Sequence, residues 1–489
     1  MRGDTKGPQR QPLAPLRSDF AVGFHSEAQI EPLRDATLRL LERTGVRYAS
    51  PKALAILAKA GARVDEASER VRLPRELVEE TLALAPRTFT LGARDASCDL
   101  AVGSGYTYGT TDGCGVEVVD WRTGERRKST KADLEAVTRM QDCLGSISFW
   151  WPTVSAGDCG ETAQLHEIEA GWNNTSKHLM GMVQGEGLAR HAVEMATTVA
   201  GGPEGLRRRP VMSNLIGTVS PLVHDKDGIE AGLVFAEAGI PVCYVTMPNL
   251  GTTAPATKAG AFVVGAAEIV AAAVLHELAA PGAPVLGSII QIYADPRTAL
   301  TMTTPLDDRC RFLATELLHA FGLPALGPMG GTDAPDAGSW LAGVETILQL
   351  LQVPLDGCEL YTGIGLTNTY NLFIPENLIL DDDLYHRARY AFLDVPMDED
   401  ALALDVIDAV GPGGHFLAQT HTRLHMRDAV VRAVSQQIAA DGQHYRDPLE
   451  VARERALDIL DNYRPKPLPE AQQAELRRIV DDADREARG

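Results

Sequence analysis

Short apolar runs alternate with longer amphipathic stretches along most of the chain, and this alternation predicts its fold. The short runs suit buried strands, whereas the stretches between them repeat apolar residues at helical spacing. Such alternation predicts a parallel sheet, and seven or eight units in a row predict closure into a (β/α)8 TIM barrel. We expect an eighth strand near 413–418 or in the N-terminal lobe. The seven strands that the pattern predicts are 147–154, 177–183, 210–220, 241–251, 284–294, 324–331 and 358–365.

The two ends of the chain follow other patterns. Residues 27–86 predict helices, one of them capped by Ser50, and the short alternating runs of 88–129 predict a small β-rich lobe with a hairpin. From residue 398 onward the sequence predicts a charged helical tail. The expected class is therefore α/β. Its expected divisions are a flexible arm (1–26), a helical and β-hairpin lobe (27–130), the barrel catalytic domain (131–420) and a C-terminal helical extension (421–489).

Composition and charge exclude several classes of partner. The 489 residues are 45% hydrophobic, which is enough for a large globular core. The formal charge is −20, and no run of Lys or Arg forms a basic stripe that could neutralise phosphates. We therefore expect neither nucleic acid nor an anionic membrane surface as a partner.

Cysteine usage and the polar N-terminal residues indicate the expected compartment. The seven cysteines are scattered and contain no CxxC pair, which favours reduced thiols. The N-terminal residues contain no apolar signal segment, so we expect a cytoplasmic protein. The most apolar stretch, residues 261–278, carries Glu268, His276 and Glu277, and suits a helix packed in the protein interior better than a membrane span.

The junction between the sixth predicted strand and its helix marks a candidate site. In a barrel of parallel strands, such junctions open on the rim where ligands bind. Gly330, Gly331, Thr332 and Asp333 form a turn at this junction, and we take them as candidate site residues, with Asp333 as a candidate catalytic residue. Turn chemistry alone also explains these residue types.

Several segments resemble the trimethylamine methyltransferase family. The resemblance is carried by TGVRYASPKALAILAKAGARVD (44–65), GGTDAPDAGSWLAG (330–343), ENLILDDDLY (376–385), ALDVIDAVGPGGHFLAQTHTRLHMR (403–427) and ILDNYRPKPLP (459–469). It covers about residues 30–485, and GPGGHFL with the trailing HTRLH is its most specific motif.

The resemblance implies a (β/α)8 methyltransferase that passes a methyl group from a methylated amine to the cobalt of a corrinoid (cobalamin) carried by a partner protein. Some members of the family contain pyrrolysine and act on trimethylamine, whereas characterised members without it act on betaines. This chain contains standard residues only, so it resembles the non-pyrrolysine group. Glycine betaine or a related quaternary amine is the expected substrate. The residue equivalent to pyrrolysine would lie near 330–334.

The chemistry of such a reaction asks for a cage of aromatic side chains. Demethylating a quaternary ammonium releases a neutral amine, so the site must mainly hold the cation, aim one methyl group and exclude water. Adjacent Trp150 and Trp151 must point to opposite faces of their strand, and we choose Trp150 as the inward one. The aromatic residues that we assign to substrate binding are Tyr106, Tyr108, Trp150, Trp340, Tyr361 and Phe373.

Polar residues near the predicted rim complete the candidate set. Gln291 ends the fifth strand and is a candidate substrate-binding residue. The NNTSKH run (173–178) is either a carboxylate partner or turn chemistry at the opposite end of the barrel. His415 in GPGGHFL is a candidate catalytic or corrinoid-docking residue. His421 and His425 lack a placed carboxylate or cysteine, so we expect no metal.

Two other functions remain open. The methyl acceptor could be tetrahydrofolate instead of a corrinoid, or the protein could bind a betaine without catalysis. A fold alone does not decide between them, because function depends on the site. A homo-oligomer is the default expectation for a large enzyme.

Overall fold

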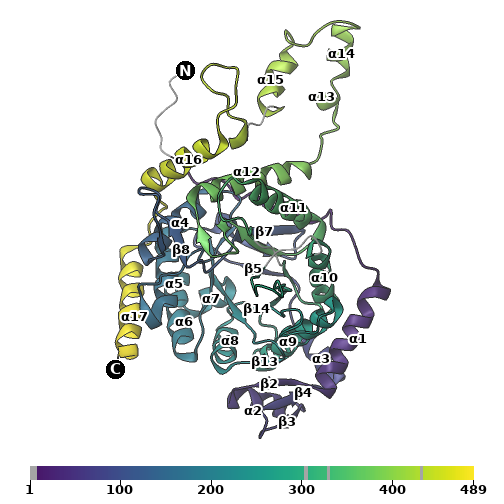
Figure 1. The fold of residues 1–489 in the computed structure, drawn as a ribbon, viewed down its shortest axis with the longest axis vertical. Coiled ribbons are helices and arrows are strands. Elements are labelled where there is room, and N and C mark those ends of the chain that lie inside the picture. Colours follow the sequence, from purple (N-terminus) through teal and green to yellow (C-terminus); the bar gives the residue numbers. More distant parts are fainter. Residues whose placement is uncertain (1–7, 302–306, 328–330, 430–432, 489) are drawn as a thin grey trace.

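The computed structural model describes residues 8–301, 307–327, 331–429 and 433–488 and has a mixed α/β fold. Helices surround a set of short central strands (Figure 1). Each of the seven predicted strands is confirmed within its predicted range. These strands are β10 (Phe149–Trp150), β11 (His178–Gly181), β12 (Met212–Gly217), β14 (Val242–Thr246), β15 (Val285–Ile289), β16 (Leu326–Gly327) and β17 (Leu360–Ile364).

An eighth parallel strand comes from the N-terminal lobe. β7 (Tyr106–Thr111) pairs in parallel with β17, which leaves 413–418 outside the sheet. Strands β10, β11, β12, β14 and β15 form one parallel sheet, and β16, β17 and β7 form another, with β1 (Leu16–Arg17) antiparallel at its edge. Regular strand pairing therefore divides the described parallel strands between two sheets.

Hydrogen bonds join the two sheets on both sides. Gly287 of β15 pairs in parallel with Ala325, just before β16. On the other side, the backbone amide of Ser148 donates to the carbonyl oxygen of Gly109 at 2.7 Å, which places β10 beside β7. The eight parallel strands thus follow one another in the order β7, β10, β11, β12, β14, β15, β16 and β17.

Helices follow the strands and cover their outer side. α4 begins where predicted, because the Thr130 hydroxyl accepts from the Asp133 amide and the Asp133 carboxylate accepts from the Thr130 amide. α9 is long and apolar enough to cross a membrane, but 83% of its most apolar window is buried inside the protein. The helices are α4 (Lys131–Cys143), α5 (Ala163–Asn174), α6 (Glu186–Ala200), α7 (Pro203–Arg208), α8 (Lys226–Ala238), α9 (Lys258–Ala279), α10 (Asp307–Ala320), α11 (Trp340–Asp356) and α12 (Pro375–Ala391).

The segment before β7 contributes three α-helices and a hairpin that closes one end of the set of parallel strands. The hairpin of β5 and β6 lies at the amino-terminal ends of the parallel strands, where the Gly92 amide donates to Pro210 O at 2.8 Å. A small sheet of β2, β3, β4 and β13 lies beside the helices. The elements are α1 (Glu27–Arg43), β2 (Val46–Tyr48), α2 (Pro51–Lys59), β3 (Arg63–Asp65), β4 (Arg70–Arg72), α3 (Arg75–Leu82), β5 (Phe89–Leu91), η1 (Ala96–Cys98), β6 (Leu100–Val102) and β13 (Val223–His224).

A second small sheet lies at the carboxyl-terminal side of the strands. β8 and β9 form the predicted hairpin, and β19 pairs in parallel with β8. A turn of 3-10 helix precedes α5 and another follows α15 (Thr420–Ala429). The elements are β8 (Glu117–Val119), β9 (Arg126–Lys128), η2 (Gly160–Thr162), β18 (Leu366–Thr367), β19 (Leu372–Phe373) and η3 (Val434–Gln436).

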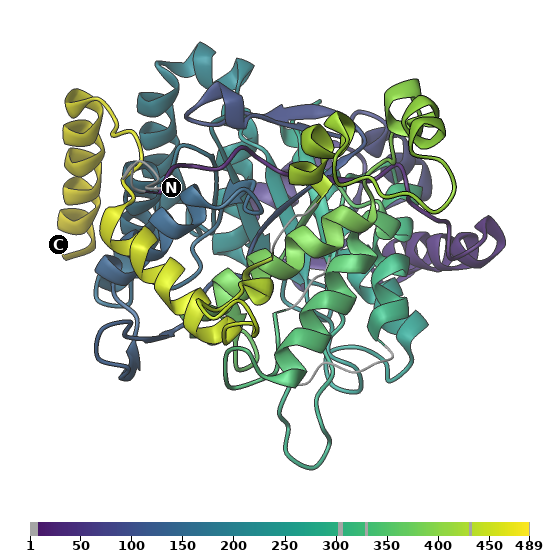
Figure 2. The same cartoon turned by 90° about the horizontal axis from the view of Figure 1, so that it is seen from above.

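The C-terminal part divides into projecting and packed helices. α13 (Glu399–Leu402), α14 (Leu404–Val410) and α15 (Thr420–Ala429) form a projecting segment that extends away from the body (Figure 1). α16 (Pro448–Asn462) packs on α12 and α4, and α17 (Glu470–Arg488) packs on α6 and α5. Figure 2 shows these last two helices along one side of the molecule.

The buried apolar side chains form two clusters on opposite faces of the parallel strands. The larger cluster lies between strands and helices. The smaller cluster is enclosed by the strands, and the β5–β6 hairpin closes it at their amino-terminal ends. It consists of Leu91, Leu100, Val102, Tyr108, Phe149, Trp151, Met180, Leu215, Cys243, Val245, Leu286, Leu326 and Leu360. We call this side of the strands the inner face.

Candidate active site

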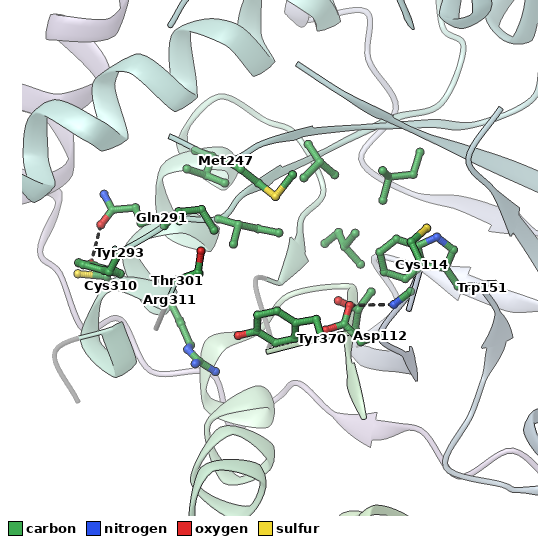
Figure 3. A pocket seen from close by; sticks show the side chains of 18 of the residues that line it. Asp112, Cys114, Trp151, Met247, Gln291, Tyr293, Thr301, Cys310, Arg311 and Tyr370 are labelled. Carbon is green, nitrogen blue, oxygen red and sulfur yellow. Dashed lines mark hydrogen bonds between the residues drawn. The ribbon is translucent and has the colours of Figure 1, made fainter. Parts of the chain in front are cut away.

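The inner face opens into a cavity of about 320 Å³ at the carboxyl-terminal ends of the parallel strands. Residues that end strands or directly follow them line it, among them Asp112 after β7, Trp151 after β10, Met247 after β14 and Gln291 after β15. Most of the lining is apolar. Of the described lining residues, Asp112 and Arg311 carry charged side chains. Figure 3 shows the cavity with these residues.

Asp112 provides a carboxylate inside this apolar cavity. One of its oxygens accepts from the Gly113 amide at 2.8 Å, and the Gly331 amide also donates to the carboxylate. Burial raises the pKa of Asp112 to about 6, while these two amides oppose the rise. The side chain is therefore mostly ionised at pH 7 and offers a negative charge to a ligand.

Trp151 forms the wall next to Asp112. The Gly113 backbone lies directly against the indole, since a Cβ at Gly113 would be 2.8 Å from Trp151 Cε2. The chain must have a glycine there for the ring to occupy this position. The Trp151 carbonyl accepts from Gln141 Nε2 at 2.9 Å, which fixes the backbone that carries the ring.

The choice of Trp150 as the inward tryptophan is corrected by the structure. Trp150 is fully buried on the outer face, where its Nε1 donates to Thr138 Oγ1 of α4 at 2.9 Å. Its ring packs against Gly171 of α5. Because neighbouring strand residues point to opposite faces, Trp151 is the one that lines the cavity.

Arg311 and Tyr370 supply the other polar features of the cavity. Arg311 lies on α10 and is 9% exposed. In the view of Figure 3, the Tyr370 ring lies between Arg311 and Asp112. The described lining of the cavity therefore combines a carboxylate, a guanidinium and the aromatic side chains of Trp151 and Tyr370.

The position of Tyr370 depends on an unusual turn. Asn368, Thr369 and Tyr370 have φ values of 53°, 53° and 66°, a left-handed conformation that non-glycine residues rarely adopt. The predicted sixth junction holds this turn, since the Asn368 amide donates to Ala334 O at 2.7 Å and the Thr369 amide donates to Thr332 O at 3.1 Å. The junction thus supports the cavity wall.

The predicted junction residues lie beside the cavity rather than in its lining. Gly331 donates its amide to Asp112. Thr332 Oγ1 donates to Glu345 at 2.5 Å, and the Asp333 amide donates to the same carboxylate at 3.0 Å. Gly330 lies outside the described residues.

Gln291 is the predicted substrate-binding residue that lines the cavity. Its Nε2 donates to Lys258 O at 2.9 Å, and its Oε1 accepts from the Tyr293 hydroxyl at 3.0 Å. The Lys258 ammonium lies 5.3 Å from the centre of the Tyr293 ring. These contacts fix the side chains after β15 and the start of α9.

The other predicted site residues lie elsewhere. Tyr361 and Phe373 are fully buried outside the cavity, and Tyr361 stacks on Tyr385 with ring centres 6.5 Å apart. Tyr108 lies deeper on the inner face, where its hydroxyl accepts from the Ala101 amide. Three predicted site residues in the described part of the chain are exposed to solvent. Tyr106 is 43% exposed, Trp340 is 87% exposed, and His415 lies on the projecting segment.

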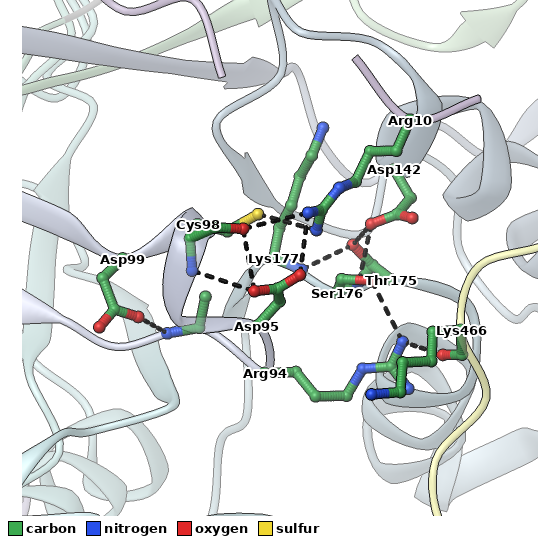
Figure 4. A network of polar contacts seen from close by, with 12 residues as sticks. Arg10, Arg94, Asp95, Cys98, Asp99, Asp142, Thr175, Ser176, Lys177 and Lys466 are labelled. Atoms are coloured by element: carbon green, nitrogen blue, oxygen red, sulfur yellow. Dashed lines mark hydrogen bonds and ion pairs between the residues drawn. The ribbon is translucent and has the colours of Figure 1, made fainter. Parts of the chain in front are cut away.

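The NNTSKH run is structural, as one of the two interpretations predicts. Lys177 Nζ donates to three carbonyl oxygens at 2.6 to 2.7 Å, those of Gln141, Leu144 and Ile147, and burial lowers its pKa to about 8. Asp142 accepts from Thr175 and Ser176. Figure 4 shows this network at the amino-terminal side of the strands, where Arg10 also joins it.

The cavity does not offer the ligands of a metal centre. Its described lining contains one carboxylate and the thiols of Cys114 and Cys310, without a group of three metal-ligating side chains close together. Burial raises the pKa of Cys114 to about 12, so its thiol stays protonated at neutral pH. The arrangement suits binding and orientation of a charged organic molecule.

Sequence reasoning missed Asp112, Arg311 and Tyr370 as site residues. Asp112 directly follows the run YTYGTT, which would have marked a strand end if β7 had been counted among the parallel strands. Arg311 lies in an ordinary amphipathic helix. No local signal distinguishes it.

Comparisons with known proteins agree over nearly the whole chain. The model of the trimethylamine methyltransferase (MTTB) family matches residues 4–488. The chain is 32% identical over 476 residues to trimethylamine methyltransferase MttB of Desulfitobacterium hafniense (strain DSM 10664 / DCB-2), covering 96% of this chain and 95% of that protein. It is 29% identical over 468 residues to glycine betaine methyltransferase of D. hafniense (strain Y51), covering 93% and 96%.

A structural likeness is weaker. The crystal structure of monomethylamine methyltransferase (MtmB) from Methanosarcina barkeri covers 91% of this chain and 90% of that chain, with a TM-score of 0.47 and 10% sequence identity.

Proposed function

Because the chain belongs to the trimethylamine methyltransferase family and is a methyltransferase of the EC 2.1.1 type, we propose that it demethylates a betaine. The proposed substrate is a quaternary amine with a carboxylate, such as glycine betaine. The proposed acceptor of the methyl group is Co(I) of a corrinoid carried by a partner protein.

The observation that carries this proposal is the pair of opposite charges in one apolar cavity. Asp112 with Trp151 and Tyr370 suits a quaternary ammonium, and Arg311 suits the carboxylate of the same molecule. Each ring face contributes about 0.5 to 2 kcal/mol to binding of a cation. Trimethylamine would present a cation without a carboxylate, and Arg311 would then have no anionic group of the ligand to bind.

The size of the cavity fits a small substrate. Its volume of about 320 Å³ lies at the lower end of the range of roughly 300 to 1,000 Å³ for ligand pockets. Apolar residues such as Leu215, Val245 and Ile289 form most of the remaining lining and offer water few hydrogen-bond partners. A cavity poor in water strengthens the electrostatic contacts between the protein and a charged ligand.

In the proposed reaction, the residues of this chain bind and orient. The bond between the methyl carbon and nitrogen breaks, and its electron pair stays on nitrogen to give a neutral tertiary amine. No general acid is required. Because the positive charge on nitrogen decreases in the transition state, Asp112 contributes binding and position rather than selective stabilisation of the transition state. Trp151, Tyr370 and Arg311 restrict the ammonium to one orientation.

Exposed apolar side chains at the carboxyl-terminal side of the strands support docking of a corrinoid protein there. Val219, Met247 and Leu300 lie in loops at the carboxyl-terminal ends of the strands and are 49%, 53% and 68% exposed. Such apolar groups at the rim favour contact with another protein. When docked there, the corrinoid would supply Co(I) as the nucleophile for the methyl group.

We also propose that the eight parallel strands form one (β/α)8 barrel. The hydrogen bonds at Gly287 and at Gly109 support this, because they join the two sheets on both sides. The proposed barrel domain is residues 131–420 with β7 added from the lobe of 27–130, preceded by the arm of 1–26 and followed by the extension of 421–489. The free thiols of all seven cysteines support a reducing compartment such as the cytoplasm, and we retain a homo-oligomer as the proposed assembly.

A methyl-transfer assay by mass spectrometry tests the function. Purified protein is incubated with glycine betaine, proline betaine, carnitine, choline or trimethylamine, once with reduced free cobalamin and once with tetrahydrofolate. We expect loss of one methyl group from a betaine, dependent on Co(I) and slower in the Asp112→Asn variant at subsaturating betaine concentrations.

Three results would overturn parts of this proposal. Transfer that depends only on folate would replace the acceptor. Demethylation of trimethylamine or choline in preference to every betaine would contradict the role of Arg311. Tight binding of one betaine without transfer to either acceptor would favour a binding protein.

A further inference from the structure

The projecting segment brings together three side chains that can bind a metal ion. His421 and His425 lie one turn apart on α15, with ring centres 4.2 Å apart, and Asp400 of α13 faces them. His425 Nε2 lies 3.0 Å from Asp400 Oδ2, and His421 Nε2 lies 2.9 Å from the main-chain oxygen of Asp400. One ligand atom from each residue lies within 4.8 Å of the other two. The structure thus places the carboxylate that the sequence pattern of the two histidines lacks.

These ligand types and distances suit zinc. Two imidazole nitrogens and one carboxylate oxygen form a common set for Zn²⁺, with bonds of about 2.0 to 2.2 Å. Tetrahedral geometry with such bonds separates the ligand atoms by roughly 3.4 Å. The pair formed by His425 and Asp400 is already close to this separation. Both histidines would exchange a contact of Nε2 with Asp400 for the metal: His425 with the carboxylate and His421 with the main-chain carbonyl.

Little internal packing stabilises the projecting segment. α13 and α14 have 4 and 7 residues, and isolated helices shorter than about 12 residues are marginal in water. Apolar side chains along the segment are exposed: 66% for Leu404, 85% for Leu417 and 62% for Leu424. A cross-link between α13 and α15 would close the chain between Asp400 and His421 and stabilise the segment.

We propose that Asp400, His421 and His425 bind one Zn²⁺ ion that fixes α13 against α15. The three residues leave a fourth position for water, because no fourth His, Cys or carboxylate joins this group in the described part of the chain. The site lies on the projecting segment, apart from the cavity, and its role is structural. This proposal does not depend on the methyl-transfer reaction.

Metal analysis of the full-length protein tests the site. Protein with its affinity tag removed is purified without chelators, and bound zinc is measured by inductively coupled plasma mass spectrometry. The apoprotein is then titrated with Co²⁺, whose visible spectrum reports tetrahedral nitrogen and oxygen ligands. We expect about one zinc ion per chain and a loss of affinity of more than about a hundredfold in His421→Ala and His425→Ala.

His444→Ala is the matched control. His444 Nδ1 also lies close to a carboxylate, 2.8 Å from Asp441, and is exposed, but it has no second histidine beside it. We expect this variant to keep the zinc content and the Co²⁺ spectrum of the parent. Equal metal binding by the parent, His421→Ala and His425→Ala would overturn the assignment, as would a parent that binds no zinc at micromolar concentration.

Limited proteolysis adds a readout of the structural role. Zinc should slow cleavage within residues 395–429 of the parent, and a chelator should restore the faster cleavage seen without zinc. His421→Ala should be cleaved at one rate with or without zinc. Protection by zinc that persists in His421→Ala would contradict the proposed cross-link.

Discussion

On the inner face of the parallel strands, Trp151 borders a cavity, whereas one residue earlier on the outer face Trp150 packs between helices. Both indoles are almost fully buried, at 8% and 0% exposure. Trp150 Nε1 donates to Thr138, but Trp151 Nε1 has no hydrogen-bond partner among the described residues. Burial alone therefore does not distinguish a core aromatic residue from a ligand-binding one. The face of the strand does.

The charged groups repeat this contrast. Lys177 lies among three carbonyl acceptors at the amino-terminal side of the strands. Asp112 at the carboxyl-terminal side accepts hydrogen bonds from backbone amides and still faces the cavity. A buried charge whose partners all come from the protein stabilises the fold, and one that also borders a cavity can bind a ligand.

The tryptophan pair should give the largest difference. Trp150→Ala removes a core side chain and should lower the free energy of unfolding by about 3 to 5 kcal/mol. Trp151→Ala should instead weaken betaine binding by about 0.5 to 2 kcal/mol through loss of one ring face. Thermal unfolding and calorimetric titration of both variants measure the two effects. Weaker betaine binding by folded Trp150→Ala than by Trp151→Ala would invert the assignment of the faces.

Loss of the cavity carboxylate should give the next largest effect. Asp112→Asn leaves the shape of the cavity but removes the partner of the ammonium, which should cost about 2 kcal/mol or more of binding energy, or roughly thirtyfold in Kd. Calorimetric titration with glycine betaine measures it. Asp336→Asn, an exposed aspartate outside the cavity, is the control. If Asp333→Asn abolished binding and Asp112→Asn did not, the junction rather than the cavity would hold the substrate.

Arg311 sharpens the contrast between ligands with and without a carboxylate. Arg311→Gln should weaken the binding of glycine betaine by about 1.5 to 3 kcal/mol, because charged hydrogen bonds to the ligand carboxylate are lost. Choline has the same ammonium group and no carboxylate, so its Kd should change little. Titration of both ligands into both proteins provides the comparison. An equal loss for choline would mean that Arg311 supports the cavity without contacting the ligand.

The pH dependence of binding should be the smallest effect. Burial raises the pKa of Asp112 in the free protein to about 6, and a bound cation lowers it. The complex therefore binds fewer protons than the free protein, and affinity falls as the pH drops below about 6, by at most tenfold per pH unit. Affinity measured between pH 5 and 8 should show this fall in the parent and none in Asp112→Asn. A flat profile in the parent would remove Asp112 from the ammonium site.

Much of the fold could be predicted from the sequence, because each strand and helix has a local pattern. The seven predicted strands and the capped start of α4 are confirmed. Of the predicted substrate-binding residues, Gln291 lines the cavity, since it lies just beyond the carboxyl-terminal end of β15. Tyr361 lies near the start of β17 in the outward register, and it therefore packs on Tyr385 outside the cavity.

The sequence by itself determined where strands and helices lie, the apolar core and the family. Only the tertiary structure decided which face of each strand points inward. Parallel strands covered by helices are apolar on both faces, so alternation shows that Trp150 and Trp151 point apart without showing which one points in. The tertiary structure also decided that β7 joins the parallel strands and that Asp112, Arg311 and Tyr370 line one cavity. Contacts between residues this far apart along the chain depend on how the whole chain packs, and no local pattern encodes them.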